Sequence, residues 1–310
     1  MYILIIYLFI FKFDINTTIM SFNPADNIQD LQNFGEFGGV NPSISDSSTY
    51  TFMAAKTMAD TFEGNTDGCH LYSRHTTPSN LCLGEALAAM EGTETANVSA
   101  SGMGAITPVL LQLCGAGDHI VSSRTIYGGT YAFLKNFTPR LAIQTSFVDI
   151  TNLEIVEAAI TENTKVLYCE SVSNPLLEVA NIKGLAALAK KYSLTLVVDN
   201  TFSPLSISPI QLGADVVVHS LTKFINGSSD AVGGVVCGSQ EFIDQLRSVI
   251  DGACMLLGST MDSLRASSIL KNLRTLHIRM KQHSYNASYL ANKFEADGIK
   301  TVYPGLESHP

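Results

Sequence analysis

The chain has 310 residues, of which 46% are hydrophobic and 15% are charged, a balance that supports a buried core and excludes a largely disordered protein. Its formal net charge of -9, without a basic cluster, argues against nucleic-acid binding and favours a small-molecule substrate. The six cysteines lie far apart with no CxxC or CxxH pair, so neither a metal site nor a disulfide framework is expected. We interpret them as reduced thiols of a cytoplasmic protein.

Residues 1–19 form an apolar leader, in which the first 13 residues are almost wholly hydrophobic. No positive charge precedes this run, no small-residue cleavage site follows it, and it is shorter than the roughly 20 residues that span a bilayer. We therefore predict neither a signal peptide nor a membrane anchor. From Met20 onward the composition is that of an ordinary soluble protein, and we expect the native chain to start at Met20. N-terminal sequencing of the protein from its own cell would test this expectation.

Residues 20–67 are rich in Ser, Thr, Asn and Gly and predict an extended arm with one short helix at 54–62. From 68 to 258 helical and strand patterns alternate, which is typical of an α/β domain whose mostly parallel sheet is flanked by helices. The predicted strands are 96–99, 119–122, 165–170, 195–199, 216–220 and 233–237. The predicted helices between them are 79–91, 102–114, 129–137, 152–161 and 183–192.

After residue 258 the pattern becomes mainly helical, with a long stretch at 261–296 that contains no proline. A short apolar segment at 299–303 then predicts a strand. One strand cannot satisfy its own backbone groups. Residues 259–310 are therefore predicted to be an incomplete α+β domain.

Two of the predicted strand ends carry groups that could hold an anion and a cation, at the edge where open α/β sheets bind ligands. The run from Ser101 through Gly102 and Met103 begins a helix, where backbone N–H groups can bind a phosphate, although a simple helix cap is the alternative. Asp199 ends a very apolar strand, and a buried carboxylate needs several donors or a cation such as a protonated heteroaromatic nitrogen. The alternative is that Asp199 only caps the next turn.

Three further strand ends carry candidates for cofactor chemistry. Tyr127 could stack on a flat cofactor and transfer a proton, and Asn174 could donate to a phenolate oxygen, although a packing tyrosine and an Asn-Pro turn are ordinary features. Ser220 and Thr222 could bind a phosphate beside Lys223, whose amine could form a Schiff base, although a solvated charge explains a lone lysine. Together these groups are what pyridoxal phosphate requires, and the lack of a GxGxxG motif disfavours a dinucleotide.

These motifs resemble the Cys/Met-metabolism family of pyridoxal-phosphate-dependent enzymes, which includes cystathionine γ-synthase, cystathionine γ-lyase, methionine γ-lyase and the O-acylhomoserine sulfhydrylases. The resemblance runs from about residue 49 to the C-terminus. It implies a type I PLP-transferase-like fold and a homotetramer, a dimer of dimers with active sites shared between subunits. It also implies a lyase or transferase of sulfur amino acid metabolism, acting by γ-elimination or γ-replacement on methionine, cystathionine or O-acylhomoserine.

The resemblance assigns a role to each matched residue. Lys223 is expected to carry the cofactor and move protons, Tyr127 to stack on it and protonate the leaving group, and Asp199 to pair with its pyridine nitrogen. The other implied cofactor-binding residues are Tyr72, Arg74, Gly102, Met103, Asn174, Ser220 and Thr222. Of these, Tyr72 and Arg74 would reach the phosphate of a neighbouring subunit, which nothing in their local sequence indicates.

Departures from the family pattern leave the substrate open. Gly129 stands where methionine γ-lyases typically have a cysteine, and the loops at 75–78 and 199–204 differ from the usual versions. Family members also continue beyond residue 310 and carry there the arginine that pairs with the substrate carboxylate, so the resemblance implies a C-terminally truncated chain. The alternative is a catalytically inactive homologue that binds the cofactor or associates with other subunits. An aminotransferase or desulfurase relative is disfavoured by the joint occurrence of these motifs.

Overall fold

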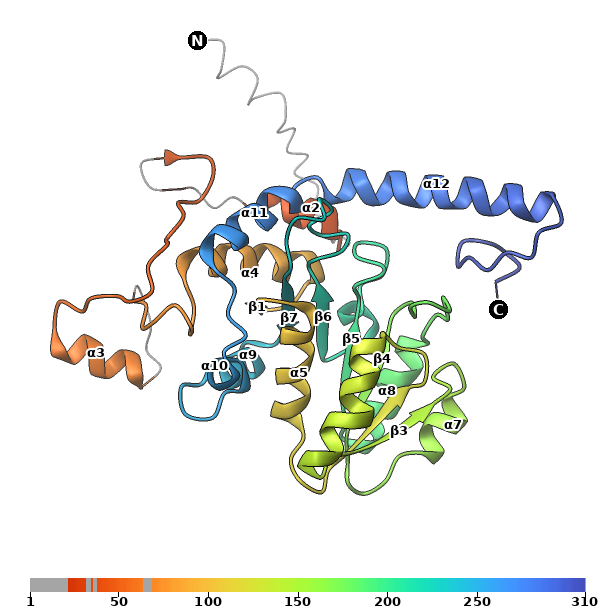
Figure 1. The fold of residues 1–310 in the computed structure, drawn as a ribbon, viewed down its shortest axis with the longest axis horizontal. Helices are drawn as coiled ribbons and strands as arrows, with labels where there is room; N and C mark the ends of the chain where they lie inside the picture. Colours follow the sequence, from red (N-terminus) through yellow and green to blue (C-terminus); the bar gives the residue numbers. More distant parts are fainter. Residues whose placement is uncertain (1–21, 32–34, 36–37, 64–68, 310) are drawn as a thin grey trace, which may run out of the picture.

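The computed structural model describes residues 22–31, 35, 38–63 and 69–309, and the predicted leader lies outside them. The described residues form a seven-stranded sheet in the order β1-β7-β6-β5-β4-β2-β3 (Figure 1). The strands from β6 to β3 run parallel, whereas β7 is antiparallel to both of its neighbours, β1 and β6. The predicted mostly parallel α/β sheet is therefore confirmed.

The strands are β1 (Thr95–Ser99), β2 (His119–Ser123), β3 (Gln144–Val148), β4 (Thr164–Glu170), β5 (Thr195–Asp199), β6 (Val216–Ser220) and β7 (Gly234–Gly238). Six of them agree with the predicted strands to within one residue at each end. The exception is β3, which the sequence analysis missed. It pairs only with β2, and it is partly exposed along most of its length, so it lacks the apolar run that marks a buried strand.

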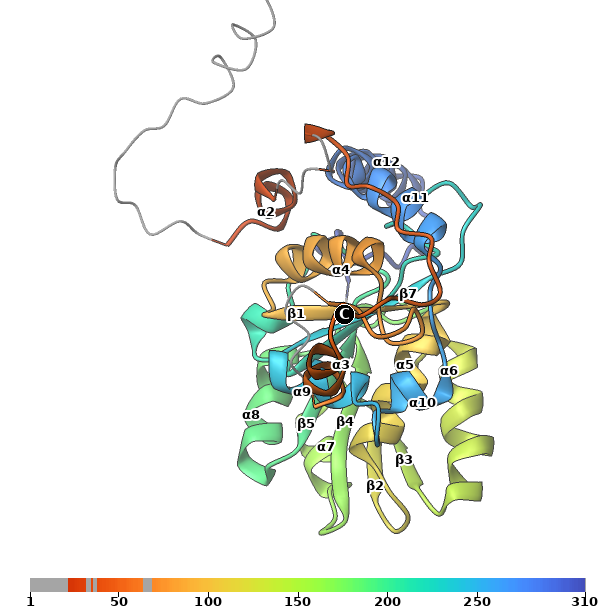
Figure 2. The same ribbon diagram turned by 90° about the vertical axis from the view of Figure 1, so that its left-hand side faces the viewer.

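Helices cover both faces of the sheet (Figure 2). One face packs against α4 (Pro78–Glu91), α7 (Leu153–Ala158), α8 (Ile182–Tyr192) and α11 (Ser263–Leu273). The opposite face packs against α5 (Gly102–Leu113), α9 (Gln240–Arg247), α10 (Ala253–Leu257) and the π-helical turn Phe133–Phe137, which continues α6 (Gly128–Ala132). Alternate strand residues belong to the two cores, Val198 to the first and Val197 to the second, because successive side chains of a strand point to opposite faces.

The structure corrects the predicted ends of the chain. The arm contains α2 (Pro24–Asp30) as well as the expected α3 (Ala55–Phe62), and α2 packs on α4. The stretch at 261–296 divides into α11 and α12 (Leu276–Ala296), since the chain turns between Leu273 and Leu276, which are both fully buried. The strand prediction for 299–303 is wrong, because no strand of the described chain lies beside this segment to pair with it.

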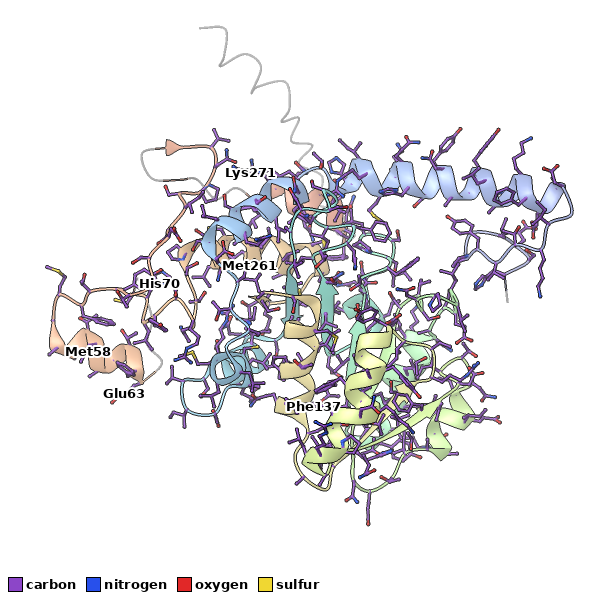
Figure 3. The ribbon with its side chains drawn as sticks, in the orientation of Figure 1. Met58, Glu63, His70, Phe137, Met261 and Lys271 are labelled. Atoms are coloured by element: carbon purple, nitrogen blue, oxygen red, sulfur yellow. The ribbon has the colours of Figure 1, made fainter. Side chains whose placement is uncertain are left out.

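Two helices stand away from the body of the molecule (Figure 1). On α12 the side chains of Tyr285, Tyr289 and Phe294 are exposed. Met58 lies on α3, at the other side of the view, and Glu63 directly follows this helix (Figure 3). Within the described ranges, no helix is both long and apolar enough to cross a membrane.

Candidate active site

The N-terminus of α5 lies against the end of β6 and forms a cradle for an anion. Ser101 caps the helix, with its Oγ accepting a hydrogen bond from the N–H of Gly104 at 2.9 Å. The first-turn N–H groups of Gly102 and Met103 have no carbonyl four residues earlier within the helix and are available to a ligand. A Cβ on Gly102 would lie 2.8 Å from the Cβ of Ser220 and 3.0 Å from its Oγ. Only glycine permits this approach, which brings two predicted phosphate-binding positions together.

The turn after β6 positions the predicted lysine and two hydroxyl groups. The N–H of Ser220 donates to Thr201 Oγ1 at 2.7 Å. Thr222 Oγ1 is fixed against the backbone of Gly233, donating to its carbonyl at 3.3 Å and accepting from its N–H at 3.1 Å. Lys223 follows with an exposed side chain, and within the described part of the chain it forms no ion pair. Its amine is therefore free to react.

Arg279 of α12 stabilises the same loop and was not identified from the sequence. Its guanidinium donates to the carbonyl oxygen of Phe224 and, at 2.9 Å, to that of Ile225. Nothing in the local sequence distinguishes Arg279 from the other charged residues of a long helix. It binds the two residues that follow Lys223 and so fixes the backbone from which the lysine projects.

Two buried carboxylates lie side by side at the ends of β4 and β5, where Glu170 pairs in register with Asp199. Asp199 Oδ1 accepts from the N–H of Thr201 at 2.9 Å, and the hydroxyl of Tyr168 lies 3.5 Å from its Oδ2. Burial raises the pKa of Asp199. Burial, followed by the charge of Asp199, raises the pKa of Glu170 to about 7.

The Asp199 carboxylate fits the group that the sequence predicts beside it. Within the described residues no lysine or arginine pairs with it, although it is only 6% exposed. An uncompensated carboxylate at this depth is costly unless a cation neutralises it. A protonated pyridine nitrogen is such a cation, and the α5 cradle would take the phosphate of the same molecule.

Glu170 links the two remaining loops of the site and was missed by the sequence analysis. Its Oε1 accepts from the backbone N–H of Tyr127 at 2.6 Å, and its Oε2 accepts from the N–H of Asn174 at 2.8 Å. A charged residue closing an otherwise apolar strand was the available signal. One buried carboxylate therefore holds both loops that carry predicted cofactor-binding side chains.

The ring of Tyr127 is 47% exposed, at the residue before α6. It lies over Gly129, where an added Cβ would be 2.5 Å from the ring's Cε1. Asn174 is also exposed and precedes Pro175 through a cis peptide bond. Both side chains are thus accessible to a ligand, as the sequence predicts.

Tyr72 and Arg74 contact each other, and Arg74 also contacts the segment at 255–260. The guanidinium carbon of Arg74 is 5.6 Å from the Tyr72 ring centroid, and its Nη1 donates to the carbonyl of Met255 at 2.7 Å. Neither side chain hydrogen-bonds to a strand-end residue in the part of the chain that the structure describes. The predicted site residues that a single chain brings to the carboxyl ends of the strands are Gly102, Met103, Tyr127, Asn174, Asp199, Ser220, Thr222 and Lys223.

The sequence of the chain is similar to those of known proteins. The family model for "Cys/Met metabolism PLP-dependent enzyme" matches residues 26–310. A methionine gamma-lyase of Arabidopsis thaliana is 46% identical over 93% of this chain and 67% of its own length. An O-succinylhomoserine sulfhydrylase of Pseudomonas aeruginosa is 41% identical over 85% of this chain and 65% of its own length. The chain thus spans about two thirds of the length of these relatives.

A solved structure extends the likeness to three dimensions. A putative O-acetylhomoserine (thiol)-lyase of Campylobacter jejuni, which contains N'-pyridoxyl-lysine-5'-monophosphate, superposes with a TM-score of 0.83 at 29% identity. The alignment covers 93% of this chain and 78% of that protein. The chain belongs to the Cys/Met-metabolism family of pyridoxal-phosphate-dependent enzymes.

Proposed function

We propose that this chain binds pyridoxal 5'-phosphate at the strand ends and acts as a lyase or transferase on sulfur amino acids, by γ-elimination or γ-replacement on methionine, cystathionine or O-acylhomoserine. The observation that carries the proposal is the pairing, at one edge of the sheet, of a buried uncompensated carboxylate with a helix N-terminus open to a phosphate. Membership of the family and the names of its relatives support the same class of reaction.

Each residue of the site has a distinct task in this proposal. The N–H groups of Gly102 and Met103 bind the phosphate together with the hydroxyls of Ser220 and Thr222. Asp199 holds the proton on the pyridine nitrogen, and Asn174 lies beside the ring hydroxyl. When bound, pyridoxal phosphate withdraws electrons from the substrate Cα.

Lys223 and Tyr127 would perform the proton transfers. The Nζ of Lys223 removes a proton from the substrate Cα and delivers protons to neighbouring carbons. The Tyr127 ring orients the cofactor by stacking, and its hydroxyl supplies a proton to the leaving group. Its place beside Gly129 and the hydrogen bond from its N–H to Glu170 support this orientation.

A homotetramer in the cytoplasm is part of the proposal. Arg74 and Tyr72 are exposed, and within the described residues their side chains form no hydrogen bond to the strand-end residues, which supports a role in the site of a neighbouring subunit. Exposed apolar side chains on and beside α3, namely Met53, Met58 and Phe62, offer a surface for that contact. All six cysteines are free thiols, which supports a reducing compartment.

The cofactor assignment is tested by reconstituting the protein with pyridoxal phosphate and recording its absorbance. The unaltered protein is expected to gain a band near the visible edge, and Lys223→Ala is expected to lose it. Lys183→Ala, which alters an exposed lysine of α8, is the matched control and should keep the band. A reconstituted protein without the band would refute the proposal.

A catalytically inactive homologue is the second candidate. It is favoured by the position of Arg279, which lies beside the Lys223 loop but is engaged with backbone carbonyls and does not offer its guanidinium to a substrate carboxylate. Turnover assays with methionine, cystathionine and O-acetylhomoserine separate the two. Release of a 2-oxo acid or formation of a replacement product from any of them would exclude the inactive protein.

A further inference from the structure

Behind the active site, on the sheet face covered by α4, five buried polar residues form one connected group, which we call the rear network. Its members are Glu91, His219, Asn200, Ser171 and Ser203, and none is more than 7% exposed. Glu91 Oε1 lies 2.6 Å from His219 Nε2 and accepts from the Asn200 side-chain amide at 3.3 Å. The Asn200 Oδ1 accepts from Ser171 Oγ at 2.7 Å and from Ser203 Oγ at 3.0 Å.

Three members of the rear network are the chain neighbours of site residues. His219 precedes Ser220, Asn200 follows Asp199, and Ser171 follows Glu170. The side chain of His219 points to the opposite face of β6 from that of Ser220, as successive strand residues do. The network therefore connects the ends of β4, β5 and β6 at the positions where these strands carry the site.

Stability does not explain this arrangement. Among the described residues, Glu91 Oε2 and His219 Nδ1 are buried without a hydrogen-bond partner, and an unpaired buried polar atom lowers stability. Well-packed apolar residues of similar volume would in general stabilise the fold at least as well as these polar groups.

The electrostatic interaction between His219 and Asp199 instead connects the rear network with the site. Burial raises the pKa of Asp199, and the neighbouring His219 opposes that rise. Glu91 Oε1, 2.6 Å from His219 Nε2, fixes the position of the imidazole. An ionised Asp199 is the state that holds a pyridinium proton.

We propose that Glu91, His219, Asn200 and Ser171 are positioning residues of the active site, which hold the ends of three strands in register and so fix the positions of Asp199 and Ser220. The inference rests on the proposed function, because it assigns to Asp199 the proton of the pyridine nitrogen. None of these residues touches the cofactor directly. His219, Asn200 and Ser171 each act through the site residue beside them in the chain, and Glu91 acts through His219 and Asn200.

The test compares cofactor affinity with the stability of the cofactor-free protein. Glu91→Gln replaces the carboxylate that contacts His219 and Asn200 by an amide, and it should weaken binding of pyridoxal phosphate roughly tenfold. Ser171→Ala removes one hydroxyl and should weaken it severalfold. Affinity is measured by titrating the cofactor-free protein and following absorbance, and the melting temperature is measured on the same samples.

His119→Gln is the matched control. His119 is also buried and also joins three strands, with Nδ1 2.8 Å from Thr164 Oγ1 and Nε2 2.9 Å from Ser146 Oγ. It lies at the amino end of β2, at the opposite edge of the sheet from the site. The control should lower the melting temperature and leave the affinity for pyridoxal phosphate unchanged.

Unchanged affinity in both test variants, with a melting temperature lowered as in the control, would show that the rear network is only structural and overturn the inference. If Glu91→Gln does not fold, the affinity of Ser171→Ala decides between the two outcomes, because this variant lacks only one oxygen atom and is expected to fold. A lack of the absorbance band in the unaltered protein would contradict the proposed function, and the inference with it. If the unaltered protein shows the band and the variants bind pyridoxal phosphate as tightly as it does, only the inference is contradicted.

Discussion

The buried carboxylates of Glu170 and Asp199 make the stability of the cofactor-free protein depend on pH. The pKa of Glu170 is raised from 4.5 to about 7 by burial and by Asp199. Between these values the folded state keeps a proton that the unfolded state releases. The contribution of Glu170 to the free energy of unfolding therefore falls as the pH rises from about 4.5 to about 7, and is constant above that range.

Urea denaturation of the cofactor-free protein across this pH range measures the effect. Glu170→Gln removes the titrating group and should flatten the dependence. An unchanged slope in the variant would show that Glu170 is not the group responsible.

A side chain at position 129 should disturb the Tyr127 ring. In Gly129→Ala the new Cβ would start 2.5 Å from the ring's Cε1, so the ring must turn away. We expect kcat to fall about tenfold or more, because a displaced Tyr127 ring would no longer orient the cofactor or place its hydroxyl beside the leaving group. The control is Gly128→Ala, whose added Cβ meets no atom within 4 Å. Equal kcat values for the two variants would contradict the role given to the ring position.

At the scale of single residues, the sequence predicted the groups that directly follow a strand. Asp199, Lys223 and Gly102 could be identified because each ends or follows a recognisable strand, and such ends meet at one edge of the sheet. Glu170 was missed because its role is to bind two backbone N–H groups, which no side-chain pattern reveals. The rear network was missed for a related reason, since Glu91 and His219 lie far apart in the chain and come together only when α4 packs on β6.

Among the elements, α5 owes its orientation toward the site to its N-cap. Ser101→Ala removes the hydrogen bond from the Gly104 N–H and should lower the free energy of unfolding by about 1 kcal/mol. Because the same turn supplies the N–H groups that would bind the phosphate, affinity for pyridoxal phosphate should also fall. Chemical denaturation and cofactor titration measure the two effects.

Ser239→Ala is the control for this prediction. Ser239 caps α9 in the same way, accepting from the Phe242 N–H at 3.2 Å. It follows the antiparallel strand β7 and so lies at the opposite edge of the sheet from the site. A comparable loss of stability is expected with no change in cofactor affinity. A loss of affinity in both variants would mean that α5 has no special role.

Elements were predicted well where burial imposed a clear pattern and poorly elsewhere. Buried strands such as β5 and β6 have continuous apolar runs that locate them from sequence alone. The edge strand β3 and the short helix α2, with one buried residue, have no such signal. The segment at 299–303 has the composition of a strand, but a strand also requires a neighbour, which local sequence cannot supply.

For the molecule as a whole, the proposed role of Arg74 in the site of a neighbouring subunit predicts that chains complement one another. Arg74→Ala and Lys223→Ala should each be nearly inactive alone. In a mixed oligomer, one site can combine an intact Lys223 from one chain with an intact Arg74 from the other, so refolding the two variants together should restore part of the turnover. Mass spectrometry of the intact assembly verifies that mixed oligomers form. Mixed oligomers without recovered turnover would place Arg74 outside the shared site.

The order of the strands in the sheet could not be predicted from the sequence. The alternation of helices and strands predicts parallel neighbours, and the strands from β6 to β3 satisfy it, but β7 enters antiparallel between β1 and β6. That position depends on the packing of α4 on β1 and β7 at one face of the sheet and of α5 on β1, β7 and β6 at the other. No local pattern in residues 234–238 indicates it.

The insertion of β7 also sets when the protein can become functional during synthesis. The strand β1 is held in the sheet only by β7, which is more than a hundred residues further along the chain. The anion cradle after β1 likewise depends on Ser220, which emerges late. Contacts between such distant segments close slowly, because the intervening chain must first lose its freedom. The nascent chain can thus fold the units around β2 to β5 early, but it should be unable to capture its cofactor until residue 238 has left the ribosome.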